Sequence, residues 1–120
     1  MIPNIPFDTK DLQAKDNKWI HPWEELAKTG KQQRTVITGG DGIYVYDSDG
    51  NRLIDGPAGM WCVNVGHGRA EIAEAIAEQA RRMTYYSPWS LTNAPAAELA
   101  DKIVSIAPDG FNHVFFTTGG

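Results

Sequence analysis

Apolar positions recur with helical spacing in two stretches of the chain. Between residues 69 and 83, one apolar residue falls every three or four positions, which predicts an amphipathic helix with a single buried stripe. A second helix is expected to begin after Asn93, a good N-cap residue, with Pro95 in its first turn, and to end before Pro108-Asp109-Gly110. The first stripe consists of Ile72, Ile76, Ala80 and Met83, and the second of Leu99, Ile103 and Ile106.

Between residues 34 and 55 the pattern changes to the two-residue alternation of strands. Thr35-Val36-Ile37 is strand-like, and a cluster of glycines at 39–42 indicates a turn. The β-prone run 43–47 is followed by Asp49-Gly50, the usual signature of a tight turn, and then by residues 51–55. This stretch therefore predicts a β-hairpin.

The first 33 residues show weaker patterns. Pro3 and Pro6 favour an irregular arm over residues 1–8. Asp8 is placed to cap a short helix from Thr9 to about Lys15, and Pro22 fits the first turn of a further helix over residues 24–28.

Residues 56–68 are rich in glycine and yet apolar. A loop of this composition is expected to be buried at a domain contact, at a subunit contact or under a ligand. Cys62, beside Trp61, is interpreted as a small buried apolar residue because no basic cluster adjoins it. His67 precedes a helix as a lone histidine and is interpreted as structural.

Residues 113–117 predict a short buried strand that leads into Thr118-Gly119-Gly120. Glycines after a strand let backbone N–H groups approach an anion at the start of a following helix, so Gly119 and Gly120 are candidate phosphate contacts. On this pattern we expect the chain to continue beyond residue 120.

Composition narrows the classes of function. The chain has 120 residues, of which 42% are hydrophobic and 22% charged, and its net charge is −4. These values are typical of one folded domain, and they give no basic face for nucleic acid. No stretch suits a membrane span or a secretory signal, and the single cysteine fits a reducing compartment, so a cytoplasmic protein is expected.

Three tryptophans are the remaining candidates for chemistry. Trp23, Trp61 and Trp89 all lie in loops or at helix starts beside proline or glycine, a setting that favours an apolar pocket for a small ligand. No histidine, cysteine or carboxylate group has metal-ligand spacing, so no metal site is predicted.

An ordered series of segments resembles the class III, or omega-type, aminotransferases. The most specific segment, Ala58–Gly68, points to the branch that acts on omega-amino acids or amines with pyruvate. The resemblance covers nearly all of the chain from about Trp19. The matching segments are residues 21–23, 42–47, 49–56, 58–68 and 114–120.

The resemblance implies an α/β fold-type I enzyme that uses pyridoxal phosphate and works as a homodimer or a dimer-based tetramer. Gly119 and Gly120 then match the cofactor's phosphate loop, with glycine at 119 where the family commonly has serine. Trp23, Trp61 and Trp89 match substrate-pocket aromatics, with Trp89 reached from the partner subunit; tryptophan at 23 and 89 would narrow the pocket against bulky aryl amines. The Schiff-base lysine of the family matches no lysine here, so the 120-residue chain alone is predicted to be inactive.

The implied organisation has three parts. Residues 1–33 form an arm with short helices, 34–68 form the hairpin and the glycine- and tryptophan-rich loop of a small α+β domain, and 69–120 lead into the large cofactor domain. Two other readings stay open: another fold-type I pyridoxal enzyme such as an aminomutase, and a non-catalytic interaction module.

Overall fold

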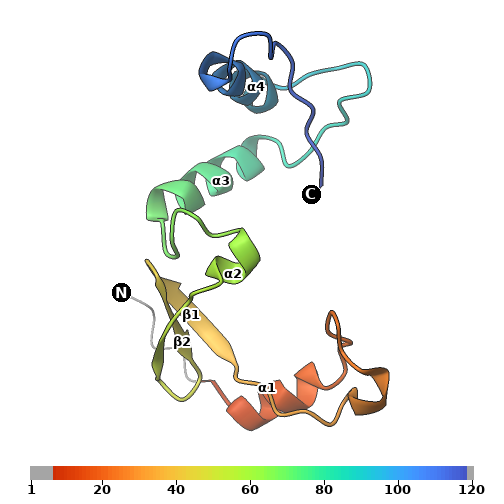
Figure 1. Ribbon diagram of the computed structural model, residues 1–120, viewed down its shortest axis with the longest axis vertical. Helices are drawn as coiled ribbons and strands as arrows, with labels where there is room; N and C mark the ends of the chain where they lie inside the picture. The colour runs from red at the N-terminus through yellow and green to blue at the C-terminus, as the bar shows by residue number, and fades with distance from the viewer. Residues whose placement is uncertain (1–6, 119–120) are drawn as a thin grey trace. The chain divides into compact units, whose positions relative to one another are not determined.

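The computed structural model describes residues 7–118 and divides into two compact units, residues 1–73 and 74–120. The first unit holds helix α1 (Thr9–Asp16), the short 3-10 helix η1 (Leu26–Lys28), three strands and the single turn α2 (Ala58–Trp61) (Figure 1). Helix α3 (Ala70–Arg82) crosses the boundary, and the second unit holds helix α4 (Ala94–Ile106). Each unit is described by itself.

The first unit contains an antiparallel sheet of three strands in the order β1-β2-β3. The strands are β1 (Ile37–Asp41), β2 (Tyr44–Asp47) and β3 (Arg52–Ile54). The hairpin predicted around Asp49-Gly50 is confirmed, because Tyr44 pairs with Ile54 and Tyr46 with Arg52 on either side of it. Gly50 has a φ of 85°, a conformation that glycine adopts at little cost.

The turn predicted over residues 39–42 is wrong in extent. Gly39, Gly40 and Asp41 belong to β1 and pair with Tyr46, Val45 and Tyr44. Only Gly42, with a φ of 58°, takes up the turn conformation. The glycines at 39 and 40 therefore lie in a strand, where one of them leaves room for a side chain from another segment.

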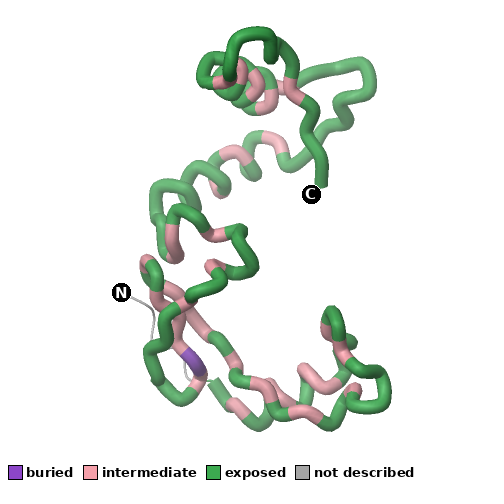
Figure 2. The backbone as a smooth tube through the Cα atoms, in the orientation of Figure 1, coloured by how far each residue is buried: buried purple, intermediate pink, exposed green. Residues whose placement is uncertain are grey.

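A single residue among those described, Asp47, is buried, with 8% of its surface exposed (Figure 2). Its Oδ1 accepts hydrogen bonds from the N–H groups of Asp49 (3.0 Å) and Asn51 (2.8 Å), and its Oδ2 accepts one from Asn51 Nδ2 (2.9 Å). These bonds, led by those from Asn51, lower the pKa of Asp47. The carboxylate thus organises the turn between β2 and β3.

The N-terminal helix forms as expected, whereas the second predicted helix does not. Asp8 caps α1 by accepting a hydrogen bond from the N–H of Asp11 (3.0 Å). After Pro22, only η1 is helical, because Trp23 has a φ of 59° and takes the chain out of the right-handed region.

Both predicted amphipathic helices are confirmed as α3 and α4. The side chain of Asn93 accepts a hydrogen bond from the N–H of Ala96 (3.1 Å), and Pro95 lies in the first turn of α4. No helix within residues 7–118 has both the length and the apolar character needed to cross a membrane.

The strand predicted over residues 113–117 is wrong for this structure, which has no regular secondary structure there. A strand needs a partner for its backbone N–H and C=O groups, and the described part of the second unit contains no other strand. Phe115 and Phe116 are consequently exposed (89% and 48%). Gly119 and Gly120 lie outside the described residues.

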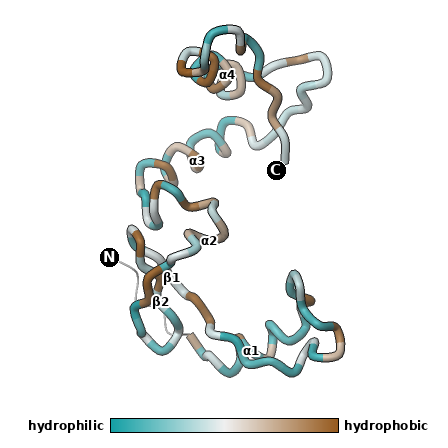
Figure 3. Tube along the Cα trace, viewed as in Figure 1, coloured by the Kyte–Doolittle hydropathy of each residue, from teal (hydrophilic) through white to brown (hydrophobic). Residues whose placement is uncertain are grey.

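Apolar side chains throughout residues 7–118 remain accessible, and none of them is buried. The hydrophobic stretches of Figure 3 coincide with exposed or half-exposed segments of Figure 2. The expected burial of the 56–68 loop by the chain itself is therefore not found. Cys62, predicted to be buried, is exposed, and its Sγ lies 3.2 Å from the carbonyl oxygen of Met60, because the tight turn before it directs the side chain outward.

We predict that Asp47→Ala lowers the midpoint of thermal unfolding near pH 7, since three hydrogen bonds are lost. Because folding lowers the pKa of Asp47, its stabilisation is complete above the unfolded-state pKa of about 3.9 and is lost as the pH falls through the folded-state value. The difference between wild type and variant should thus shrink below about pH 4. Asp49→Ala, at an exposed position of the same turn, is the control, and an equal effect of both variants would contradict the role given to Asp47.

Candidate functional site

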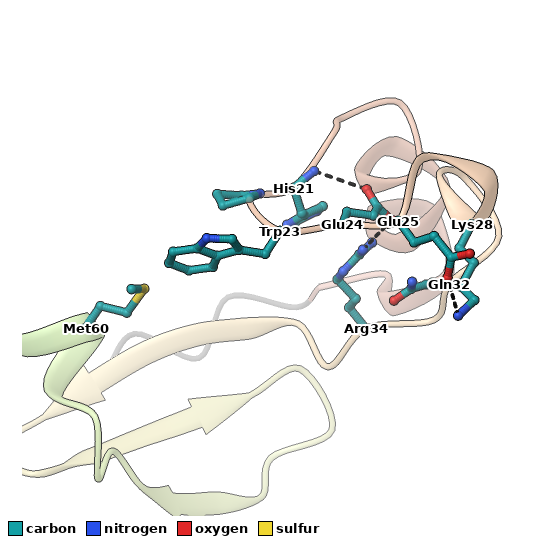
Figure 4. A pocket seen from close by; sticks show the side chains of 9 residues that line it. His21, Trp23, Glu24, Glu25, Lys28, Gln32, Arg34 and Met60 are labelled. Carbon is teal, nitrogen blue, oxygen red and sulfur yellow. Dashed lines mark hydrogen bonds and ion pairs between the residues drawn. The ribbon is translucent and has the colours of Figure 1, made fainter.

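Two loops of the first unit line one open cavity of about 530 Å³, the Trp23–Met60 pocket. One loop contains Trp23 and Glu24, and the other contributes Met60 from α2. Figure 4 shows the indole of Trp23 extending toward the Met60 side chain, with Arg34 beneath the first loop. An apolar side chain from each loop therefore faces the same space.

The Trp23 loop is held by a buried carboxylate. The Glu24 side chain is 1% exposed; its Oε2 accepts a hydrogen bond from the N–H of His21 (3.1 Å), and its Oε1 pairs with Arg34 Nη2 at 2.6 Å (Figure 4). Arg34 also contacts Asp16 (3.2 Å), which in turn contacts the ring of His21 (2.9 Å). These contacts enclose Trp23 on both sides of its strained backbone.

Charge pairing explains the pKa shifts in this cluster. The hydrogen bond from Arg34 is the main cause of the lowered pKa of Glu24, and the N–H of His21 adds to it. The same ion pair raises the pKa of Arg34. Because Arg34 already serves two carboxylates, it is a structural cation of the loop and is not free to receive a substrate carboxylate.

The turn α2 is left-handed. Ala58, Gly59, Met60 and Trp61 have φ values of 48°, 59°, 66° and 64°, and the N–H of Trp61 donates to the carbonyl of Pro57 (2.7 Å). A left-handed conformation costs a residue other than glycine roughly 1–2 kcal/mol, so three such residues in succession need support from their surroundings. Strain of this kind clusters at functional sites.

Asp55 and His67 lie directly behind this turn. His67 Nε2 is 2.8 Å from Asp55 Oδ2, and the Asp55 side chain is 11% exposed. The hydrogen bond from His67 is the main cause of the lowered pKa of Asp55; N–H groups of Gly59 and Ala58 add to it, and burial opposes it. The carboxylate thus binds both the imidazole and the start of the left-handed turn.

His67 is itself fixed on the sheet. Its N–H and C=O exchange hydrogen bonds with Gly42 (2.8 and 3.0 Å), and its ring lies against the backbone of Gly40. A Cβ atom added at Gly40 would lie 2.6–2.9 Å from ring and Cβ atoms of His67, closer than real contacts allow. Glycine at position 40 is thereby explained, and so is the structural interpretation of His67.

The structure places the sequence-predicted residues unequally. Trp23 lines the pocket and is 87% exposed; Trp61, next to the pocket residue Met60, is 78% exposed; Trp89 is 95% exposed and belongs to the other unit. Within residues 7–118, no group of three or more metal-ligating side chains occurs. Sequence reasoning missed Met60, and its place in the apolar run before Trp61 was the available signal.

Comparison of the coordinates with solved structures defines the class of fold. A transaminase from the marine bacterium Virgibacillus superposes with a TM-score of 0.85 at 44% identity, over 92% of this chain and 26% of that one. An (S)-enantioselective omega-transaminase from Thermomicrobium roseum gives 0.84 at 35% identity, over 91% and 25%. The chain thus has the α/β fold of fold-type I transaminases, as expected.

The sequence match is equally direct. The family model described as "Aminotransferase class-III" matches residues 26–120, so the chain belongs to the class III aminotransferases. The putrescine–pyruvate aminotransferase of Pseudomonas aeruginosa is 38% identical over 95% of this chain and 27% of its own length. The diaminobutyrate–2-oxoglutarate transaminase of Halomonas elongata is 46% identical over 92% and 24%. The chain therefore spans about a quarter of the length of these relatives.

We predict that Gly40→Ala destabilises the full-length protein by roughly 1–3 kcal/mol, because the new methyl group displaces His67 from the sheet. Chemical or thermal unfolding measures the change. Gly56→Ala is the matched control: its added Cβ would meet nothing within 4 Å, and an effect within about 0.5 kcal/mol is expected. Equal stability of the Gly40→Ala variant and wild type would show that the His67 contact is dispensable.

Proposed function

We propose that the protein to which this chain belongs transfers an amino group from an omega-amino acid or amine to a keto acid such as pyruvate, with pyridoxal phosphate as cofactor. The observation that carries the proposal is the class III match over residues 26–120. The named relatives act on a diamine or on diaminobutyrate, with pyruvate or 2-oxoglutarate as partner, which supports a small amine donor and a keto-acid acceptor.

In this proposal the described residues bind and orient the donor. Trp23, Met60 and Trp61 form an apolar wall that excludes water beside the amine. Trp89, in the other unit, contributes to the site across a homodimer or dimer-based tetramer. The wall is narrow and favours short aliphatic amines over bulky aryl amines.

Gly119 and Gly120 are proposed to hold the cofactor phosphate through backbone N–H groups. When bound, pyridoxal phosphate supplies the electron sink for amino transfer. Both glycines lie outside the described residues, and the described residues bring no anion-binding set together, so no step is routed through the cofactor here. A cytoplasmic protein with domain divisions near residues 33 and 68 completes the proposal.

The test uses the full-length protein, with pyridoxal phosphate added. We predict an aldimine absorption band in the visible range and production of alanine from pyruvate with putrescine or another aliphatic amine. The isolated 120-residue chain should give neither, because it matches no Schiff-base lysine. Isomerisation of a single substrate without an acceptor would favour an aminomutase, and absence of the band would remove both enzyme functions in favour of an interaction module.

A further inference from the structure

The left-handed turn α2 needs an anchor outside itself. Its internal hydrogen bonds run from Trp61 to Pro57 and from Cys62 to Ala58 (2.7 and 3.0 Å). These bonds close the turn, but they do not fix how it sits on the sheet. A backbone this strained keeps its conformation only where neighbouring groups determine it.

Asp55 supplies that anchor through a short series of contacts. His67 is tied to β1 by its paired hydrogen bonds with Gly42, and its ring binds the Asp55 carboxylate at 2.8 Å. The same carboxylate receives N–H groups at the start of the turn, from Gly59 and Ala58. The orientation of α2 relative to the sheet therefore depends on one carboxylate that joins both.

Neither Asp55 nor His67 lines the Trp23–Met60 pocket. Both reach it only through the turn, whose Met60 side chain does line it and whose Trp61 follows directly. A displacement of the turn would move both apolar side chains together and change the width of the pocket.

We propose that Asp55, held by His67, is a positioning residue that sets amine selectivity by fixing the Met60–Trp61 turn. The inference rests on the proposed aminotransferase function. It assigns Asp55 no contact with substrate or cofactor. Loss of the carboxylate lets the turn relax, and a wider or shifted pocket then changes the preference between amines of different size.

The experiment measures kcat/KM of the full-length holoenzyme with a short aliphatic diamine and with a bulky aryl amine. Asp55→Ala should change the ratio of the two values by about tenfold, as expected when a pocket wall moves by a fraction of an ångström to an ångström. A merely structural loss of active enzyme lowers both values equally and cancels in the ratio. Asp49→Ala, at an exposed position of the same unit, should leave the ratio unchanged.

A double-mutant comparison tests whether the effect passes through the turn. In a Met60→Ala, Trp61→Ala background, Asp55→Ala should cause no further change in the ratio. An unchanged ratio in Asp55→Ala alone, or an equal change without Met60 and Trp61, would overturn the proposal.

Two further results are decisive. Asp55→Asn, which keeps one acceptor oxygen for the backbone N–H groups, should shift the ratio in the same direction by a smaller factor, and it serves if the alanine variant does not fold. A shift equal to that of alanine would overturn the role of the N–H contacts. A wild-type protein without transamination would overturn the proposed function itself, and the inference with it.

Discussion

The contact between the imidazole of His67 and the bare backbone of Gly40 is the constraint on which the rest of the first unit depends. It brings the glycine-rich loop onto β1 and places Nε2 beside Asp55. Through Asp55, the position of the sheet is passed to the left-handed turn that carries Met60 and Trp61. An isolated hairpin is marginally stable, so this docking also gives the sheet a partner.

Both walls of the Trp23–Met60 pocket follow the same physical plan. In each, an aromatic residue with positive φ stands at the tip of a loop, and a carboxylate at the base is paired with a cation or a histidine: Glu24 with Arg34, and Asp55 with His67. Exposed ion pairs contribute little to stability, but Glu24 is almost wholly enclosed and Asp55 nearly so, and each also binds backbone N–H groups. Their role is to fix loop geometry.

The elements that depend on local sequence could be predicted. The caps Asp8 and Asn93 and the Asp49-Gly50 turn all form where the pattern indicated, because each acts over a few residues. The errors arise from contacts between distant residues. Gly40 belongs to a strand because His67 lies on it, the second helix is replaced by the Glu24–Arg34 cluster, and residues 113–117 lack a strand to pair with. Of the candidate site, the three tryptophans were identifiable from their settings, whereas Met60 required the handedness of α2.

The left-handed turn also limits which amino acids can be exchanged in this wall. A β-branched side chain is strongly disfavoured at positive φ, so valine, isoleucine and threonine are unsuitable at positions 60 and 61. Leucine, methionine, aromatic residues, asparagine and glycine remain usable. Diversification of the pocket, by natural drift or in a mutant library, therefore works with a reduced alphabet here and gains most by varying side-chain length and ring size.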